Sequence, residues 1–441
     1  MRRYTTALDS ESDGRGGENN APRPVRYALL GEGHLVYRSV TRSDGRVHAT
    51  RHKVHRSFTS GRPEDDFDLA WLNATRPPRY RQERPECLRL ADLFCGAGGL
   101  TLGVLEAARA VGIRVEPVLG VDLEPAVERA YRANFRPASF LRSPIEGFLD
   151  GDPELMGRAN GSGDLTTAEL DLQRRVGRID LVVGGPPCQG HSDLNNHTRR
   201  NDPKNLLYGR MARFARVFRP RHLLIENVRG AAHDRAGIME KTRESLHALG
   251  YRTDTGIVRG ERVGVPQTRH RIFMVASLDR VPDVKGWTEM HSIEQRRSFD
   301  WAQTGLARDG SPLDVVTKLE PRTAQRIEWL FANDAHELPN ERRPECHRND
   351  HHTYRAVYGR IRGSLPAPTI TTGFTVMGQG RFVHPYERRT LTPREGARLQ
   401  FFPNWFSFGE ESSMTRSEVV SLIGNAVPPK MAYVLALELI R

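Results

Sequence analysis

Residues 179–192 read Ile-Asp-Leu-Val-Val-Gly-Gly-Pro-Pro-Cys-Gln-Gly-His-Ser, and this stretch decides the fold class. The apolar run at its start predicts a buried parallel strand, and the glycines and prolines after it predict a turn. Open α/β sheets place their chemistry at the carboxyl ends of such strands, where a rigidly held Cys188 would suit nucleophilic catalysis. For an isolated cysteine, the alternative is a buried structural residue.

A second junction of strand and turn lies earlier in the chain, where residues 92–100 read Asp-Leu-Phe-Cys-Gly-Ala-Gly-Gly-Leu. Residues 87–93 can form a short strand, and residues 100–111 have helical composition. Glycines between a strand and a helix let a ligand approach the backbone and face the helix N-terminus. The spacing matches neither dinucleotide sites nor Walker-type phosphate loops. A tight connection in any α/β domain would explain the glycines equally well.

An acid follows the next apolar strand, because residues 115–121 lead directly to Asp122. An acid at the end of the second strand is well placed to accept hydrogen bonds from ribose hydroxyls. The same residue could instead be the N-cap of a helix predicted over residues 124–134. Together, the glycine turn and the acid favour a cofactor that carries adenosine.

Charged side chains accompany two more apolar runs. Glu226 lies near the end of the run at 223–228, where burial would raise its pKa and suit it to donate a hydrogen bond or a proton. In residues 265–273, strand alternation would place Gln267, Arg269 and Arg271 on one face. Such a face could grip a phosphate or a base edge. A solvated edge strand is the alternative.

Taken in order, these motifs resemble the cytosine-C5 DNA methyltransferase family over residues 88–441. The resemblance implies an α/β fold, with a Rossmann-like S-adenosylmethionine-dependent methyltransferase sheet, a smaller target-recognition domain and, outside the resemblance, an N-terminal extension. The matching motifs are the glycine turn at 92–99, Pro-Cys-Gln at 187–189, Glu-Asn-Val at 226–228, Gln-x-Arg-x-Arg at 267–271, Leu-Thr-Pro-Arg-Glu at 391–395, Arg-Leu-Gln-x-Phe-Pro at 398–403 and Gly-Asn-Ala-Val at 424–427.

The resemblance implies a covalent mechanism for methyl transfer to C5 of cytosine. Cys188 would attack C6 as a thiolate, Glu226 would hydrogen-bond N3 and the exocyclic amine, and Arg271 would fix the ring through O2. Arg269 would support Cys188 and Glu226, and Gln189 belongs to the same implied catalytic set. The target cytosine has to leave the stack of the double-stranded DNA to be reached.

The resemblance also implies contacts with S-adenosyl-L-methionine, whose product is S-adenosyl-L-homocysteine, and it implies no metal. Phe94 should pack against the adenine or the sulfonium region, and Asp122 should bind the ribose. The other implied contacts come from the glycine turn and the pocket wall: Gly96, Gly98, Pro186, Leu207 and Asn425.

Two positions depart from the family pattern. No acid follows the third predicted strand, at 140–145, where the family often contacts the adenine amine, and Ser143 is a weak stand-in. His191 stands two residues after Gln189, where the family often has an aromatic residue. A loop role and a catalytic role are both open for His191.

The chain is long enough for two or three domains. The expected parts are an N-terminal extension at 1–84, a catalytic and cofactor-binding domain at 85–283, a target-recognition domain at 284–408 and a segment at 409–441 that packs back on the catalytic domain. Residues 1–20 are expected to be disordered, strands are expected near 27–37, and a polar, helix-prone insert at 147–178 has no assigned role. The extension could contact DNA, bind a partner or cover the catalytic domain.

The expected recognition domain is rich in arginine, which can read guanine in the major groove through paired hydrogen bonds. Most of these side chains should contact phosphate or solvent instead. They are Arg322, Arg342, Arg343, Arg355, Arg360 and Arg362.

Composition agrees with a DNA substrate, because 66 Lys and Arg against 54 Asp and Glu give a formal net charge of +12, which favours phosphate binding. The arginine bias could also reflect a GC-rich genome.

The 4 cysteines have spacings unlike a zinc site or a disulfide framework, which fits a reducing cytoplasm. No apolar run reaches the roughly 18 residues of a membrane span, and the basic N-terminus lacks a signal-peptide apolar region. We therefore expect a cytoplasmic protein that is a monomer on DNA.

The expected setting is a bacterial restriction-modification or phage-defence system, in which other defence components are conceivable partners. One alternative is an RNA cytosine methyltransferase on the same scaffold, against which the long arginine-rich recognition region argues. The other is a non-catalytic DNA-binding homologue, which would be expected to have lost Cys188 or Glu226, and both are present.

Overall fold

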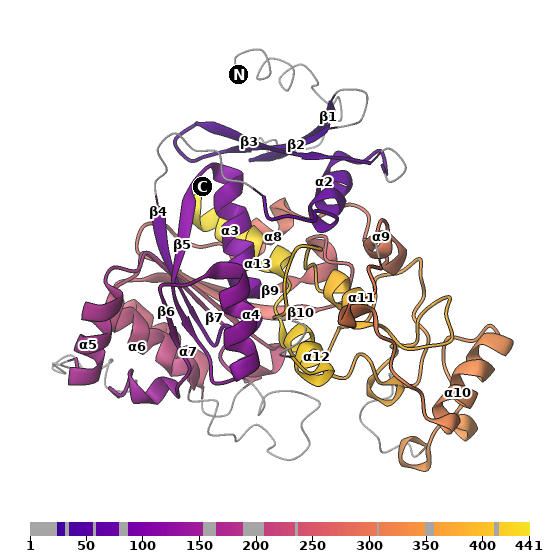
Figure 1. The fold of residues 1–441 in the computed structure, drawn as a ribbon. Helices are drawn as coiled ribbons and strands as arrows, with labels where there is room; N and C mark the ends of the chain where they lie inside the picture. Colours follow the sequence, from indigo (N-terminus) through magenta and orange to yellow (C-terminus); the bar gives the residue numbers. More distant parts are fainter. Residues whose placement is uncertain are drawn as a thin grey trace.

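A seven-stranded sheet forms the centre of the protein (Figure 1). The computed structural model describes residues 24–30, 35–55, 59–78, 87–152, 165–187, 207–233, 237–306, 308–348, 357–409 and 414–441. The sheet has the order β6-β5-β4-β7-β8-β10-β9; the strands from β6 to β8 are parallel, and β10 and β9 complete one edge in antiparallel pairs. The strands are β4 (Cys87–Leu93), β5 (Arg114–Val121), β6 (Ser139–Leu141), β7 (Leu181–Gly184), β8 (His222–Asn227), β9 (Arg252–Arg259) and β10 (His270–Ser277).

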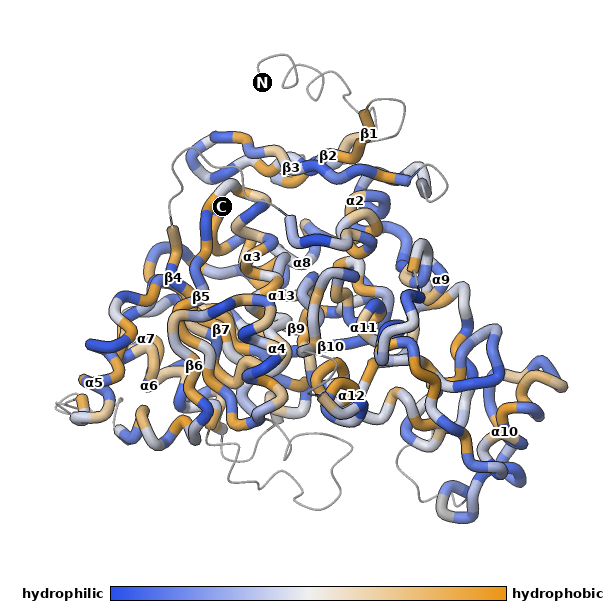
Figure 2. Tube along the Cα trace, viewed as in Figure 1, coloured by the Kyte–Doolittle hydropathy of each residue, from blue (hydrophilic) through white to orange (hydrophobic). Residues whose placement is uncertain are grey.

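Helices cover both faces of this sheet, because successive residues of the central strands enter two different cores. Leu181 and Val183 of β7 pack with helices α3, α8 and α13, whereas Val182 packs with α5, α6 and α7. Apolar runs without polar alternation are typical of parallel strands buried on both faces, and the expected α/β fold is confirmed. The helices are α3 (Gly99–Val111), α4 (Pro125–Phe135), α5 (Thr167–Val176), α6 (Gly209–Phe218), α7 (Ile238–Ala248), α8 (Val284–Met290) and α13 (Pro429–Ile440). Figure 2 shows the hydrophobic colour gathered along the central strands.

One predicted strand starts later than its sequence pattern indicates. Strand β10 begins at His270, and Gln267 forms only an isolated bridge to Ala367. Both Gln267 and Arg269 are buried. The expectation that Gln267, Arg269 and Arg271 share one strand face is therefore wrong, because only Arg271 lies in β10 and residues 267–269 precede it.

The N-terminal extension forms a small sheet that lies against the central domain at the end away from the carboxyl ends of the strands (Figure 1). Strands β1 (Val25–Leu30), β2 (Leu35–Thr41) and β3 (Val47–Lys53) pair antiparallel, and helix α2 (Pro63–Leu72) packs beneath them. The Ser43 hydroxyl donates to the carbonyl of Arg441 at 2.8 Å, and the ring of His48 lies at Gly112, the C-terminal cap of α3. Residues 1–20 are among those outside the described residues.

The region after α8 is less regular and carries a separate small core. Helix α10 (Pro321–Ala332) buries Ile327 and Leu330 there, far from the central sheet in Figure 1. Helices α9 (Phe299–Gln303), α11 (Pro393–Leu399) and α12 (Arg416–Asn425) join this region to the central domain through one shared core. The insert expected at 147–178 includes α5, and its residues 153–164 lie outside the described residues.

A helix that spans a membrane has to be both long and apolar. Among the described residues, no single helix is long and apolar enough, and one bent pair, α12 with α13, passes on length and composition alone. Helix α13 is buried along its whole length.

Candidate active site

The polar motifs meet at one edge of the sheet. Strands β4, β5, β6, β7 and β8 are parallel, so the segments that follow them all leave the sheet at its carboxyl edge. These segments contain the glycine turn, Asp122, Ser143 and the Gly-Pro-Pro run, and Glu226 lies near the carboxyl end of β8. Clefts at the carboxyl edge of parallel sheets are where open α/β proteins bind their ligands.

The glycine turn is shaped both by packing and by open space. A side chain at Gly98, where φ is 83°, would lie 2.2 Å from the ring of Phe135, and one at Gly99 would lie 1.9 Å from the carbonyl of Val427. By contrast, Gly96, with φ of 50°, has no neighbouring atom within 4 Å of the position a Cβ would take. Gly98 therefore lets the turn pack against α4, and Gly96 leaves room beside the backbone for a ligand.

Asp122 holds the end of β5 against this turn. One carboxylate oxygen accepts from the backbone N–H of Gly96 at 3.0 Å, and the other accepts from Leu123 at 2.8 Å. Burial raises the pKa of Asp122, and these backbone hydrogen bonds oppose that rise. The N-cap of α4 is Glu124, without a side-chain cap, so the alternative role of Asp122 as N-cap does not apply.

The remaining residues expected at the cofactor lie around the same edge. Pro186 is buried, and Phe94 and Leu207 are half-buried. Asn425 is exposed at the end of α12, and its amide donates to the Ser421 hydroxyl at 3.3 Å. The close approach of Val427 to Gly99 brings the segment after Asn425 to the glycine turn. The residues present therefore fit a ligand with a ribose and a flat apolar ring.

Leu123 is a residue that the sequence analysis missed. Its apolar side chain is 58% exposed although it follows Asp122 directly at the carboxyl edge. The sequence contained only that a leucine follows the predicted ribose acid, and the structure adds its exposure, which suits the wall of an apolar ligand pocket. Ser143 follows β6 at the same edge, and it is half-buried.

Glu226 and Arg271 form the ion pair of the site. The Arg271 Nε atom lies 2.9 Å from Glu226 Oε1, and the two side chains are 16% and 10% exposed. Burial raises the pKa of Glu226, while the charges of Arg271 and Arg269 oppose that rise. A side chain at Gly185 would lie 3.3 Å from the other oxygen, Glu226 Oε2. The glycine thus keeps space open beside that oxygen.

Arg269 and Gln267 hold the neighbouring loops instead of facing solvent. Arg269 donates to the carbonyl of Ile370 at 2.8 Å. Gln267 donates to the carbonyl of Leu399 and to the Gln400 side chain, and it accepts from the N–H of Ile370. Gln267 therefore has a structural role, and the expected grip of this residue on a phosphate or a base is wrong.

Cys188, Gln189 and His191 lie outside the described residues. The structure describes the chain up to Pro187, where β7 has ended beside Glu226. It resumes at Leu207, and the next residue, Tyr208, is a second residue that the sequence analysis missed. The Tyr208 hydroxyl is buried and has no hydrogen-bond partner in the part of the chain that the structure describes, and burial together with the charge of Glu226 raises its pKa.

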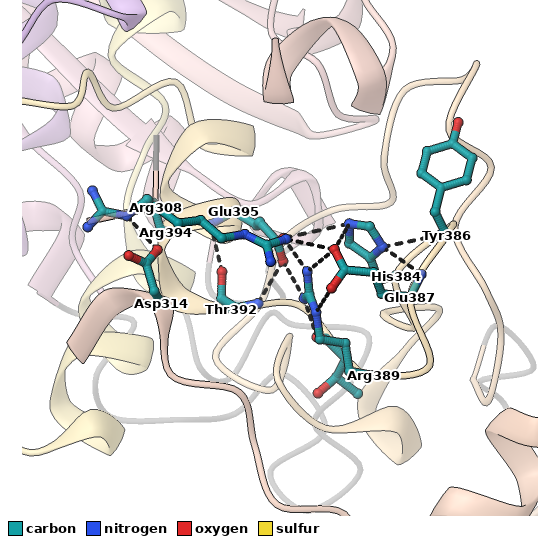
Figure 3. Close-up of polar contacts among 10 residues, drawn as sticks. Arg308, Asp314, His384, Tyr386, Glu387, Arg389, Thr392, Arg394 and Glu395 are labelled. Carbon is teal, nitrogen blue, oxygen red and sulfur yellow. Dashed lines mark hydrogen bonds and ion pairs between the residues drawn. The ribbon is translucent and has the colours of Figure 1, made fainter. Parts of the chain in front are cut away.

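One cluster of side chains has the spacing of metal ligands, but arginines already neutralise it (Figure 3). The ligand atoms of His384, Glu387 and Glu395 lie within 4.8 Å of one another. Arg389 donates to Glu387 and to Glu395, at 2.9 Å and 2.6 Å, and Arg308 approaches both carboxylates. The backbone of Thr392 also donates to Glu395 as part of a capping box at the start of α11. This cluster is an ion-pair network that anchors α11.

The arginines expected to recognise DNA differ in their surroundings. Arg360 is buried, paired with Asp334 at 2.6 Å and stacked on Phe331, so it serves the fold. Arg322 and Arg362 are exposed. Arg342 lies over the ring of Trp329, Arg343 donates to the carbonyl of Leu338, and Arg355 lies outside the described residues.

Residues 88–441 match the family of C-5 cytosine-specific DNA methylases. The chain belongs to this family. As a member, it is a DNA cytosine-C5 methyltransferase that uses S-adenosylmethionine and has DNA as its substrate.

Individual relatives agree with this assignment. The methyltransferase is 41% identical over 377 residues to the type II methyltransferase M1.BsuMI of Bacillus subtilis (strain 168), with 85% of each chain covered. It is 30% identical over 355 residues to the type II methylase M.HgiDII of Herpetosiphon aurantiacus, covering 78% of this chain and 93% of that one. The crystal structure of the S. pombe Dnmt2 methyltransferase shares the fold, with a TM-score of 0.51 and 19% identity over 80% of this chain and 98% of that chain.

Proposed function

We propose that the enzyme methylates a flipped-out cytosine in double-stranded DNA through a covalent bond to Cys188. The observation that supports this most directly is the buried ion pair of Glu226 and Arg271. It lies at the carboxyl edge of the sheet beside Gly185, two residues before Pro187. The chain continues from Pro187 to Cys188, so the thiol follows the strand that neighbours Glu226.

The pair of Glu226 and Arg271 would prepare the ring for attack. A carboxyl group with a raised pKa holds a proton near neutral pH more readily than an ordinary glutamate does. Glu226 would hydrogen-bond N3 and the exocyclic amine, which favours protonation of N3 as the sulfur adds. Arg271, held by Glu226, would fix the ring through O2. Arg269 would support the loop through Ile370, and Gln189 would act beside Cys188.

The covalent bonds then form and break in a cycle that regenerates the Cys188 thiolate. The Cys188 thiolate forms a bond to C6, and the electron pair of the C5–C6 double bond makes C5 nucleophilic. C5 would take the methyl group of S-adenosylmethionine as the bond between that methyl and the sulfonium breaks, with S-adenosylhomocysteine as the leaving group. C5 would then lose its proton to solvent, the double bond would return, and the bond between sulfur and C6 would break to free the Cys188 thiolate.

The glycine turn and the surrounding residues would hold the cofactor. Gly96 would let the methionine part approach the backbone, Asp122 would accept from the ribose hydroxyls, and Phe94 with Leu123 would contact the adenine. Gly98 would support the turn by its packing against α4. Pro186, Leu207 and Asn425 would complete the pocket wall. The proposal requires no metal.

Replacement of the nucleophile tests the mechanism. Cys188→Ser should abolish methyl transfer, because a hydroxyl at neutral pH is a far weaker nucleophile than a thiolate. Calorimetry should show that the variant still binds S-adenosylmethionine. DNA that carries 5-fluorocytosine at the target should trap the wild-type enzyme covalently, since fluorine does not leave C5 as a proton does. Active enzyme that forms no trapped adduct would refute the covalent mechanism.

The biological role that we propose is self-marking of DNA in a bacterial restriction-modification or defence system. The similarity to type II methyltransferases supports this role. We propose that the enzyme acts in the cytoplasm as a monomer on DNA, with any other defence components as separate partners. Bisulfite sequencing of DNA from expressing cells should reveal one methylated motif, and unmethylated DNA in cells that contain folded enzyme would argue against the role.

A further inference from the structure

Asp92 is the first residue of the glycine-turn motif and takes no part in the proposed methyl transfer. It is the last residue but one of β4, and its side chain is fully buried. Its Oδ2 accepts from the Thr101 hydroxyl at 2.7 Å, whereas its Oδ1 is buried and has no hydrogen-bond partner among the described residues. A buried acid that is only half satisfied costs free energy of folding, so packing alone does not explain an acid at this position.

The Thr101 hydroxyl continues from Asp92 to a third buried side chain. A hydroxyl has a single proton to donate, and Thr101 donates it to Asp92. The Tyr131 hydroxyl, which lies 2.8 Å from Thr101 Oγ1, therefore has to be the donor of the second hydrogen bond. Asp92 belongs to β4, Thr101 to the first turn of α3 and Tyr131 to α4. These three residues, which we call the Asp92 network, tie three elements together out of contact with solvent.

The ring of Tyr131 lies against two glycines that belong to different parts of the cofactor edge. A Cβ at Gly98, in the glycine turn, would lie 3.1 Å from Tyr131 Cδ2, and one at Gly120, near the end of β5, would lie 3.0 Å from Tyr131 Cε1. Phe135 lies closer to Gly98 and Phe140 closer to Gly120, but Tyr131 lies against both glycines. The position of this ring therefore affects both segments.

Asp122 ties the same two segments together at the rim of the site. Gly120 lies two residues before Asp122, whose Oδ2 accepts from the Gly96 N–H at 3.0 Å. Asp92 and Gly120 are paired residues of β4 and β5, so the network starts beside the strand that leads to Asp122. A shift of the Tyr131 ring would therefore change the spacing between the glycine turn and Asp122.

The carboxyl group of Asp92 favours its neutral form. Burial raises its pKa well above the ordinary range and the charge of Asp122 adds to that rise, while the hydrogen bonds from Thr101 oppose it. Burial raises the pKa of Tyr131 as well. A neutral carboxyl group still has an oxygen that accepts from Thr101. Asp92→Asn would keep such an oxygen without a charge.

We propose that the Asp92 network positions the glycine turn relative to Asp122 so that both contact S-adenosylmethionine. The inference rests on the cofactor site of the proposed function. The three side chains are fully buried, so they act through Gly98 and Gly120 and touch neither the cofactor nor the cytosine. Loss of the network therefore weakens cofactor binding and leaves the steps at Cys188 unchanged.

Two substitutions of Thr101 separate this positioning role from packing. Thr101→Val keeps the volume of the side chain and removes the hydroxyl, whereas Thr101→Ser keeps the hydroxyl and removes the methyl group. Calorimetry with the full chain should find that the dissociation constant for S-adenosylmethionine rises on the order of tenfold in Thr101→Val, the fold-change that corresponds to loss of a buried hydrogen bond. Thr101→Ser and Asp92→Asn should bind the cofactor almost as the wild type does. The kcat at saturating cofactor should be the same in all of them.

Tyr131→Phe gives a second test that removes one oxygen atom only, and it should also raise the dissociation constant. Thr242→Val is the matched control, because the buried Thr242 hydroxyl donates to the carbonyl of Ile238 within α7 at 2.8 Å. This control should keep the cofactor affinity of the wild type.

Hydrogen exchange of the cofactor-free enzyme reports on the turn without any ligand. The Gly96 N–H donates to Asp122, and the Gly98 N–H donates to the carbonyl of Cys95 at 2.9 Å. Both amides should exchange faster in Thr101→Val and Tyr131→Phe than in the wild type and in Thr242→Val.

Unchanged cofactor affinity in both Thr101→Val and Tyr131→Phe would overturn the proposal, and so would an equal loss of affinity in Thr101→Ser, which would point to packing. Asp122→Ala, measured in the same series, tells this result apart from failure of the cofactor site itself. If Asp122→Ala loses affinity while Thr101→Val and Tyr131→Phe do not, the cofactor site stands and only the positioning role of the network is refuted.

Discussion

At the scale of single residues, the stability of the site depends on the ionisation of Glu226. Burial raises its pKa in the folded protein above the ordinary value, which is about 4.3 in an unfolded chain. A carboxyl group with a raised pKa in the folded protein contributes to the free energy of unfolding at any pH below its pKa in the unfolded chain. That contribution is lost as the pH rises through its pKa in the folded protein. The folded enzyme is therefore penalised at neutral pH for holding a charged carboxylate in this place.

Replacement of Glu226 should reverse that penalty. Glu226→Gln removes the ionisable group, so its free energy of unfolding, relative to that of the wild type, should increase as the pH rises from about 4 to 7. Methyl transfer should fall at the same time. Urea unfolding of both proteins across this pH range measures the difference.

A second variant gives the control for that series. Glu240 is exposed, and its hydrogen bonds with Arg243 lower its pKa, so Glu240→Gln should lose stability relative to the wild type over the same rise in pH. A constant difference between Glu226→Gln and the wild type would show that the carboxyl group does not titrate abnormally.

Asp122 should matter for cofactor binding and not for DNA binding. Asp122→Ala should weaken S-adenosylmethionine binding by about 1.5–3 kcal/mol, the range for hydrogen bonds to a charged group. DNA affinity should stay nearly the same. Glu124→Ala is a matched control, because Glu124 is an exposed acid two residues away without a side-chain cap bond. Calorimetry that finds the same cofactor affinity in both variants would remove Asp122 from the site.

The positions of Asp122 and Glu226 could be predicted from sequence because each comes at the end of an apolar run, and parallel strands bring such ends together. Tyr208 could not be predicted in this way. Its hydroxyl is buried near Glu226 only because α6 starts beside β7, where Met211 packs against Gly184. Packing of this kind depends on the order of the strands, which the local pattern does not contain.

At the scale of elements, one glutamine joins α11 to the segment that ends in the Gly-Asn-Ala-Val motif. The Gln400 amide donates to the carbonyls of Ile423 and Ala426 at 2.6 Å and 3.2 Å, and its oxygen accepts from Gln267. Asn425 lies between those two carbonyls in the chain. The junction therefore joins the proposed recognition region to Asn425, which we propose lies in the wall of the cofactor pocket.

Removal of this junction should affect both stability and cofactor binding. Gln400→Met keeps the volume but leaves buried partners unpaired, which should destabilise the enzyme by about 1–3 kcal/mol. The dissociation constant for S-adenosylmethionine should also rise, because Asn425 loses its support. Denaturant unfolding and calorimetry measure the two effects.

Gln303→Met is the matched control for this experiment. The Gln303 amide is buried and has no hydrogen-bond partner among the described residues, so its removal should leave stability unchanged or increase it. Equal losses of stability in both variants would mean that the Gln400 hydrogen bonds do not contribute to the free energy of unfolding.

The same junction explains why one strand was predicted too early. The alternation of Gln267, Arg269 and Arg271 is a valid strand pattern, and only the last of them lies in β10. Gln267 instead turns inward to Gln400, a residue 133 positions later in the chain. A long-range hydrogen bond of this kind overrides a local pattern, and no window of neighbouring residues reveals it.

At the scale of the whole molecule, the extension lies away from the carboxyl edge of the sheet (Figure 1), and its helix α2 also contacts the first part of the proposed recognition region. The extension docks through a buried set of charges, with Arg297 contacting Asp65 and Asp68. Its strands could be predicted from sequence, but its place could not, because charged residues are usually assigned to the surface. Because this place is away from the carboxyl edge, we propose that the region after α9 reads DNA.

Exchange of that region should therefore move the target motif without changing the chemistry. Helices α9, α11 and α12 share one core, so a chimera should keep them and take only residues 308–391 from a relative such as M1.BsuMI. Bisulfite sequencing should then find the relative's motif methylated, while Cys188 and Glu226 remain those of this chain. An active chimera that still methylates the original motif would show that specificity lies elsewhere. The extension would then be the first region to exchange, despite its distance from the carboxyl edge of the sheet.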